Sequence, residues 1–197
     1  MSPRPGHAGR ELRDAIMRAA TRLFADQGFA ATSIRQIVEA CRCTNPSLYY
    51  YFPSKDDLYR KVVEAHIAQV TQFIRDCGNQ PGSVRDRLRG ALVILATYGR
   101  QYPESFRLLH RIDSNAQDRA PDVDVSGARR VHLELMSHIL EQGVESGEIR
   151  ATVDPTLAAL ALAGIVHFQL QHAMCTGAWD EDTISRTLDL LFDGIAA

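Results

Sequence analysis

The chain has 197 residues, of which 45% are apolar and 23% are charged, and this composition excludes an intrinsically disordered protein. Its formal net charge is only −2, but residues 1–61 hold ten Lys and Arg against six Asp and Glu, so the basic charge is concentrated there. A basic segment of this kind suits an anionic partner such as nucleic acid. The most apolar run, residues 157–166, is shorter than the ~20 residues of a membrane span, and we expect no membrane association.

The N-terminal sequence predicts a short arm followed by two helices. Residues 1–9 are rich in Pro, Gly and Arg, and we expect a disordered basic arm. Apolar residues at helical spacing predict a first helix from Arg10, which Gly28 ends. Thr32 or Ser33 then caps a second, short helix.

A third short helix and a long fourth helix follow. We expect Asn45 to cap the third helix, because Pro46 is favoured at the first helical position. Pro53 ends it after about two turns. Ser54 caps the fourth helix, which runs to about Cys77.

The rest of the chain also shows helical periodicity. Breaks at Gly, Pro and Asp divide it into further helices at roughly 83–101, 103–113, 124–146, 155–177 and 181–195. The sequence therefore predicts an all-α protein of about nine helices, with an N-terminal helix-turn-helix DNA-binding domain at 10–58 and a second helical domain at 59–197.

The stretch SLYYYFPSK, residues 47–55, places four aromatic rings in a row. Successive side chains of a helix point ~100° apart, so three consecutive tyrosines cannot share one buried face. Leu48 and Phe52 lie four residues apart and do share one face. We therefore expect those two side chains to anchor the third helix and the tyrosines to spread over its other side. A phenol offers an apolar ring and a hydroxyl that can reach a phosphate oxygen.

The stretch GFAATSIRQIVEACRCTNPSLYYYFPSKDDLYRKVV, residues 28–63, resembles the DNA-binding domain of the tetracycline-repressor (TetR) family. The resemblance covers residues 10–63 and includes Gly-aromatic, a Thr-containing cap, a short helix, a turn, and Leu-Tyr-Tyr-x-Phe before a capped Lys. It implies a cytoplasmic, nucleoid-associated bacterial regulator, most often a repressor. It also implies a homodimer that binds a palindromic operator of double-stranded DNA in the major groove and is released by an unknown small-molecule effector.

Carried over by position, the resemblance implies a set of DNA contacts along the second and third helices and the start of the fourth. These residues are Thr32, Ser33, Arg35, Asn45, Pro46, Ser47, Tyr49, Tyr50, Tyr51 and Lys55. Asn45 and Ser47 can read base edges, whereas Tyr51 and Lys55 would bind phosphates. Arg10 and Arg4 either reach a minor groove or belong to a free tail.

Two departures from the family pattern concern the turn and the third helix. Arg42 replaces a usual Gly, so it either adopts a left-handed conformation at a cost of ~1 kcal/mol or more, or the turn is rearranged. Tyr51 replaces a usual His, which removes a group that titrates near neutral pH. Cys41 and Cys43 flank Arg42, and either they are small buried side chains, which we favour, or they sense redox conditions.

The resemblance also implies a ligand pocket and a dimer face in the second domain. Candidate pocket residues mix apolar walls with a few polar groups: Tyr98, Phe106, Leu109, His110, Met136, Ile139, His167, Gln171, Met174, Cys175 and Trp179. The expected dimer face follows the last two helices through Leu157, Leu160, Ala161, Gly164, Ile165, Phe168, Ile184, Leu188 and Leu191.

The alternatives are a DNA-binding protein without a small-molecule effector and, less favoured, an all-α enzyme. The sequence contains no His-Glu-x-x-His pattern and no phosphate-binding loop, and no nucleophile is paired with a base. The histidine spacings do not place two imidazoles on one helical face. We therefore expect no catalytic residues, no metal site and no cofactor.

Overall fold

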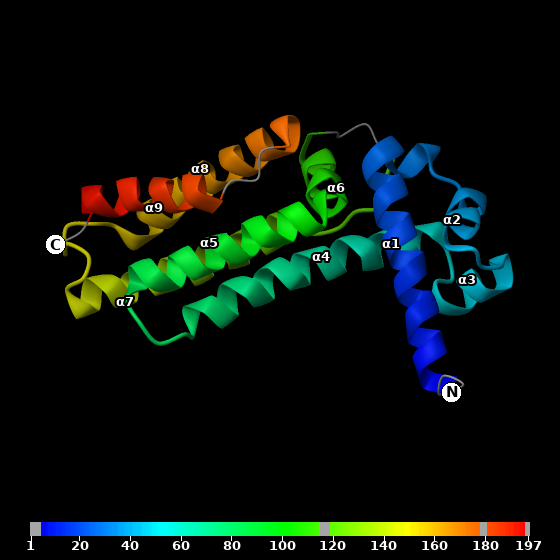
Figure 1. Cartoon of the computed structure of the whole chain (residues 1–197), viewed down its shortest axis with the longest axis horizontal. Coiled ribbons are helices and arrows are strands. Elements are labelled where there is room, and N and C mark those ends of the chain that lie inside the picture. Colours follow the sequence, from blue (N-terminus) through cyan, green and yellow to red (C-terminus); the bar gives the residue numbers. More distant parts are fainter. Residues whose placement is uncertain (1–4, 115–118, 178–180, 196–197) are drawn as a thin grey trace. The chain divides into compact units, whose positions relative to one another are not determined.

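The computed structural model describes residues 5–114, 119–177 and 181–195, and over these ranges it forms nine helices (Figure 1). This architecture confirms the all-α prediction. The helices are α1 (Pro5–Ala31), α2 (Ile34–Cys41), α3 (Asn45–Tyr51), α4 (Lys55–Gly78), α5 (Val84–Gln101), α6 (Pro103–Ser114), α7 (Val125–Ser146), α8 (Pro155–Thr176) and α9 (Glu181–Ile195).

The chain divides into two compact units. Unit 1 contains α1, α2, α3, the part of α4 up to His66, and the segment Glu104–Val123 with most of α6. Unit 2 contains Ile67–Pro103 and the chain from Asp124 onwards. The expected boundary between residues 58 and 59 thus falls inside α4. Leu58, Tyr59, Val62 and Val63 are buried side chains, all of them within unit 1.

Helix α1 begins earlier than expected and contains a break. It starts at Pro5, so residues 5–9 of the expected disordered arm are helical, and residues 1–4 lie outside the described ranges. Gly28 has φ 86° and ψ 169°, a backbone conformation that favours glycine. The predicted helix end at Gly28 is therefore seen as a kink, after which α1 continues to Ala31.

Side-chain caps define the short helices α2 and α3. Ser33 caps α2, and Gln36 returns the contact by accepting a hydrogen bond from the Ser33 amide at 2.7 Å. Thr44, and not the expected Asn45, caps α3, because Thr44 has extended φ and ψ and its hydroxyl accepts from the Ser47 amide. Asn45 instead occupies the first helical position.

Helix α4 begins as the sequence predicts. The Ser54 hydroxyl accepts a hydrogen bond from the Asp57 amide at 3.0 Å, and the Ser54 carbonyl accepts from the Leu58 amide at 3.1 Å. The acidic residues Asp56 and Asp57 lie in the first turn of α4, where negative charge is favoured by the helix dipole.

Unit 2 is built around a core that α5, α7, α8 and α9 share. Leu88, Leu140, Leu162 and Phe192 are fully or almost fully buried there, one from each helix. The packing is tight at Gly143, where an added Cβ would lie 2.7 Å from the Ile149 side chain. These apolar contacts provide most of the stability of the unit.

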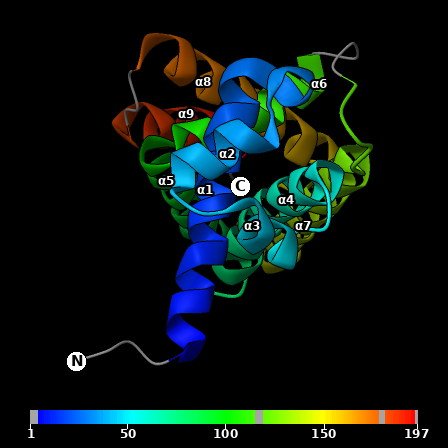
Figure 2. The ribbon, with the colours of Figure 1, turned by 90° about the vertical axis from the view of Figure 1, so that its right-hand side faces the viewer.

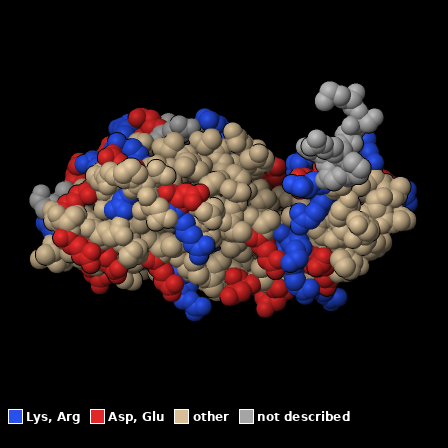
Figure 3. Space-filling model, turned by 90° about the horizontal axis from the view of Figure 1, so that it is seen from below, with Lys and Arg blue, Asp and Glu red and all other residues tan. Residues whose placement is uncertain are grey.

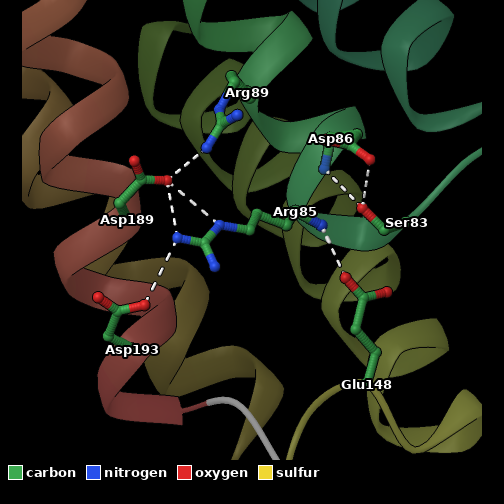
Figure 4. A network of polar contacts seen from close by, with 7 residues as sticks. All are labelled: Ser83, Arg85, Asp86, Arg89, Glu148, Asp189 and Asp193. Atoms are coloured by element: carbon green, nitrogen blue, oxygen red, sulfur yellow. Dashed lines mark hydrogen bonds and ion pairs between the residues drawn. The ribbon is translucent and has the colours of Figure 1, made fainter.

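Polar contacts join α5 to α9 and to the loop before α8 (Figure 4). Glu148 accepts hydrogen bonds from the first two amides of α5, at 2.7 Å from Val84 and 3.1 Å from Arg85. The guanidinium groups of Arg85 and Arg89 both bind the Asp189 carboxylate, with Arg85 at 2.8 Å. These hydrogen bonds lower the pKa of Asp189.

Candidate nucleic-acid interface

The third helix presents aromatic side chains to solvent from a buried anchor. Leu48 and Phe52 are 0% and 1% exposed, as their spacing predicts, whereas Tyr49 is 45% and Tyr50 is 81% exposed. Figure 2 shows α3 next to α1 and α2, with which it is in contact. A tyrosine ring that is four-fifths exposed contributes little to the core of the unit, and both its apolar face and its hydroxyl are accessible to a binding partner.

Tyr51 lies between Tyr50 and the start of α1. Its ring stands edge-on to that of Tyr50, with centroids 4.9 Å apart, and it is half-buried. A Cβ added at Gly9 would lie 3.1 Å from the Tyr51 hydroxyl, so the first turns of α1 pass close to the phenol. Arg13 of α1 lies over the Phe52 ring at 5.6 Å. These contacts make α1 a support for α3, which the sequence does not signal.

The residues predicted to contact DNA on α2 and just before it differ in their exposure. Ser33 and Arg35 are exposed, and Arg35 is paired with Glu39 of the same helix at 2.8 Å. Thr32 is 1% exposed, and its hydroxyl donates to the Gly28 carbonyl at 2.7 Å. The predicted DNA contact of the Thr32 side chain is therefore wrong, because that side chain ties α2 to the end of α1.

The start of α3 keeps its candidate groups at the surface. Asn45 and Pro46 are exposed. Ser47 is half-buried, and its hydroxyl lies 2.8 Å from that of Thr44 in the cap. Asn45 is thus the side chain of α3 that is best able to reach a base edge by hydrogen bonds.

Lys55 binds the protein itself in this structure. Its Nζ donates to the carbonyls of Phe29 and Thr32, both at 2.9 Å, and lies 4.1 Å from the centroid of the Phe29 ring. An ammonium group has three donors, so these two bonds leave one for a phosphate. Its first role is to hold the end of α1 against the start of α4.

Arg42 takes the left-handed conformation, with φ 53° and ψ 42°, so the turn between α2 and α3 keeps the geometry of the usual glycine. The side chain is exposed.

Basic residues gather on one part of the surface of unit 1. On the face in Figure 3, a band of Lys and Arg atoms, mixed with fewer Asp and Glu atoms, lies on unit 1. The band agrees with the excess of basic residues in positions 1–61. Such a surface attracts a polyanion over distances of about one Debye length, ~8 Å at physiological salt.

Helix α8 exposes an apolar stripe. Leu157, Leu160 and Phe168 are 65%, 56% and 71% exposed, and Ala161 and Gly164 between them are also exposed. The opposite side of α8 carries buried residues of the unit 2 core, such as Leu162. The helix is long and apolar enough to cross a bilayer by composition alone, but a helix with one face in a protein core is explained without a membrane.

The remaining predicted dimer residues differ in exposure. Ile165 and Leu191 are half-buried, and the side chain of Ile184 lies outside the described residues. Leu188 is 1% exposed and belongs to the unit 2 core, so its predicted contact with a partner is wrong. On α9 the neighbouring Leu190 is 76% exposed instead.

The predicted pocket residues do not come together in one unit. Phe106, Leu109 and His110 belong to unit 1, the others that the structure describes belong to unit 2, and Trp179 lies outside the described residues. Ile139 is close-packed in the core, with its side chain 3.0 Å from a Cβ added at Gly78.

The other predicted pocket residues of unit 2 form two groups by exposure. His167 and Cys175 are exposed, which leaves four half-buried candidates: Tyr98, Met136, Gln171 and Met174.

Half-buried groups that the sequence did not single out accompany Tyr98 in unit 2. Phe73 of α4 stands edge-on to Tyr98, with centroids 5.4 Å apart. The Thr71 hydroxyl lies 2.8 Å from the Ile67 carbonyl, to which it donates, and 2.7 Å from Nε2 of His132. Burial, with a smaller contribution from Arg75, lowers the pKa of His132.

Comparison with known proteins identifies the fold. The family model described as "Bacterial regulatory proteins, tetR family" matches residues 16–62, and "Tetracyclin repressor-like, C-terminal domain" matches residues 81–195. The chain is 26% identical over its whole length to the HTH-type transcriptional repressor KstR2 of Rhodococcus jostii, 98% of which is covered. It is also 26% identical to the regulator RutR of Escherichia coli K12, over 93% of this chain and 90% of RutR.

Solved structures agree with these relatives. A SmeT–triclosan complex has a TM-score of 0.80 at 22% identity, over 95% of this chain and 92% of that one. SmeT is the repressor of the Stenotrophomonas maltophilia multidrug efflux pump SmeDEF. With family models over both its N-terminal and C-terminal parts, and with α3 exposed on a buried anchor, the chain belongs to the tetR family of DNA-binding bacterial transcription regulators.

Proposed function

We propose that the chain acts as a homodimeric repressor that binds a palindromic operator through α3 and leaves it when a small molecule binds in unit 2. The observation that carries the DNA contact is the exposure of Tyr50, 81%, on a helix whose opposite face is completely buried. Tyr49, Asn45 and Arg35 are exposed nearby in sequence and extend the same surface. Their phenol, amide and guanidinium groups can bind phosphates and base edges.

The stripe on α8 supports the homodimer. A helix of seven residues reads too few base pairs by itself, and two copies of α3 about one turn of DNA apart, ~34 Å, read a palindrome. Leu157, Leu160 and Phe168 would pack against the same residues of a second copy around a two-fold axis. A Cβ added at Gly164 meets nothing within 4 Å, so a partner helix can approach closely there.

The small-molecule effector is proposed from the half-buried groups of unit 2. Phe73 and Tyr98 offer aromatic surface, and the imidazole of His132, whose Nε2 lies 2.7 Å from the Thr71 hydroxyl, adds a polar group. A site of this kind suits an apolar ligand with one hydrogen-bonding group. The triclosan complex of SmeT, a structural neighbour, supports an apolar effector.

The test is a DNA-selection assay with the purified chain, followed by gel-shift titrations on the selected sequence. We expect a palindrome, and we expect Tyr50→Ala to weaken binding at least tenfold. Tyr102→Ala is the matched control, because Tyr102 is also exposed, at 43%, but lies in unit 2. Equal affinity of the Tyr50 variant and the natural chain would contradict the proposed contact surface.

The effector is tested on the same DNA fragment with a panel of apolar phenols and fatty acids. A compound that releases the DNA should lose this effect in Tyr98→Ala while the variant still binds the operator. If no compound in a broad panel changes DNA binding, the chain is a DNA-binding regulator without a small-molecule effector.

A further inference from the structure

The turn between α2 and α3 holds two thiols in contact. Cys41 is the last residue of α2, and its Sγ lies 3.1 Å from that of Cys43, two residues later. Ordinary nonbonded contacts between heavy atoms are ~3.5–4.0 Å, and a disulfide bond is ~2.05 Å. Arg42 between them is left-handed, which turns the chain tightly enough for the two side chains to meet. The sulfurs are thus about 1 Å from bonding distance.

Small reagents can reach this pair. Cys41 and Cys43 are both half-buried, whereas Cys77 is buried in unit 2 and Cys175 is exposed on α8. The sequence-based expectation that Cys41 and Cys43 are simply buried is therefore not met. Their neighbour Arg42 is exposed, so the turn itself faces solvent.

We propose that Cys41 and Cys43 form a reversible disulfide bond with each other when low-molecular-weight disulfides oxidise them. We propose further that this bond switches off DNA binding. The second half of this inference rests on the proposed function. The Cys41 thiolate attacks one sulfur of the small disulfide, whose S–S bond breaks and releases the first small thiol. The Cys43 sulfur then attacks Sγ of Cys41 and releases the second. Two cysteine thiols are oxidised by two electrons in total, and the small disulfide is reduced to two thiols that take up the two protons.

The environment of Cys43 assigns the order of the two steps. Burial, and next the contact with the Cys41 sulfur, raise the pKa of Cys43 to about 12. Cys43 therefore stays protonated at neutral pH and is a poor first nucleophile. The closing step should accordingly become faster as the pH rises, by up to tenfold per pH unit.

Formation of the Cys41–Cys43 disulfide would displace the turn that is joined directly to α3. The Cys43 amide donates to the Val38 carbonyl at 3.1 Å, and the next residue, Thr44, caps α3. A displacement of about 1 Å at the sulfurs is shared by both ends of this turn, and binding surfaces tolerate errors of only ~0.5 Å. A ring that spans a single residue also strains the disulfide, and strained disulfides are readily reduced. We expect at least a tenfold loss of affinity for DNA, restored by a reductant.

The bond is tested first by peptide mapping, in a Cys175→Ser background that removes the exposed thiol. The chain is incubated with oxidised glutathione or with dithiothreitol, alkylated and cut with trypsin. Trypsin cleaves after Arg42, between the two cysteines, so the reduced chain yields separate peptides 36–42 and 43–55. The disulfide keeps these peptides joined, with the loss of two hydrogens. Cys41→Ser should give no joined peptide.

The switch is then tested by gel-shift titration of the same samples on a selected DNA fragment. The joined peptide together with weaker binding that dithiothreitol reverses, and that Cys41→Ser and Cys43→Ser lack, would support the inference. Absence of the joined peptide, or a joined peptide with unchanged affinity, would overturn it. A reduced chain that binds no DNA sequence would instead overturn the proposed function, and peptide mapping would still report on the thiol pair.

Discussion

Lys55 can be tested as a structural residue against its predicted role as a phosphate contact. We choose Lys55→Met, because methionine keeps an unbranched stem over the Phe29 ring and removes the ammonium group. In the variant the carbonyls of Phe29 and Thr32 lose a charged donor that lies 2.9 Å from each of them. The end of α1 and the start of α4 then lose one of the contacts that join them, while the edge-on contact of Phe29 with Tyr59 at 5.2 Å stays.

The magnitude follows from these contacts. Hydrogen bonds that involve a charged group contribute ~1.5–3 kcal/mol each, and a cation over an aromatic ring adds ~0.5–1 kcal/mol. Lys55 is half-buried, so water replaces part of both hydrogen bonds in the variant. We expect a loss of about 2 kcal/mol in the free energy of unfolding, which corresponds to a fall in Tm of ~4–8 °C for a chain of this size.

Thermal unfolding followed by circular dichroism measures the fall in Tm, and gel-shift titrations at several salt concentrations measure the slope of affinity against salt. Lys61→Met is the matched control, because Lys61 lies on the same helix but is exposed and paired with Glu64 in an exposed contact of 3.0 Å. Its loss should change stability by less than ~1 kcal/mol. If Lys55→Met leaves Tm unchanged and lowers the salt slope by about one, the ammonium group is a phosphate ligand and our reasoning is refuted.

Three further predictions concern the dimer, the core and pH. Phe168→Arg places a charge in the α8 stripe of both subunits and should give monomers in size-exclusion chromatography, whereas Tyr50→Arg, also at an exposed aromatic, should elute as the natural dimer. Leu188→Ala should lower stability by ~2–5 kcal/mol in urea denaturation without changing the elution volume, and Leu190→Ala, at an exposed position, should leave stability unchanged. Burial lowers the pKa of His66 to about 4, so between pH ~6.5 and 4 the unfolded chain binds a proton at His66 that the folded chain does not. We therefore expect the free energy of unfolding to be highest above pH ~6.5 and to fall by up to about 3 kcal/mol as the pH approaches 4. His66→Gln should remove this pH dependence.

Much of the fold could be predicted because its signals are local. The caps at Ser33 and Ser54 and the break at Gly28 depend on residues within four positions, and all three appear in the structure. The buried pair Leu48 and Phe52 follows from helical spacing alone. The predicted cap of α3 was wrong because Thr44 and Asn45 are both good caps. We chose Asn45 because proline is favoured at the first helical position, whereas Pro46 occupies the second.

Internal contacts of the candidate-site residues could not be predicted from the sequence, and the physical reason is the same for each. Thr32 and Lys55 look like surface polar residues in the sequence, but their hydrogen-bonding groups satisfy backbone carbonyls near the end of α1. Helical periodicity indicates which side chains share a face but not which backbone carbonyl a side chain binds, and Phe29, one partner of Lys55, lies 26 residues away. The predicted dimer contact of Leu188 was wrong for a related reason. The sequence of an amphipathic helix reveals its apolar face, but not whether that face packs against the same unit or against a partner subunit.

The chain enters unit 1 twice, first through residues up to His66 and again through the segment that begins at Glu104. The second passage brings the buried side chains of Phe106 and Leu108 and an ion pair between Arg107 and Asp26 at 3.1 Å. A truncated protein that stops after His66 would therefore lack part of its own interior. Exchange of the DNA-reading half between relatives should work best when α6 is transplanted with it, so recombination at a single crossover point is a poor route to new specificities.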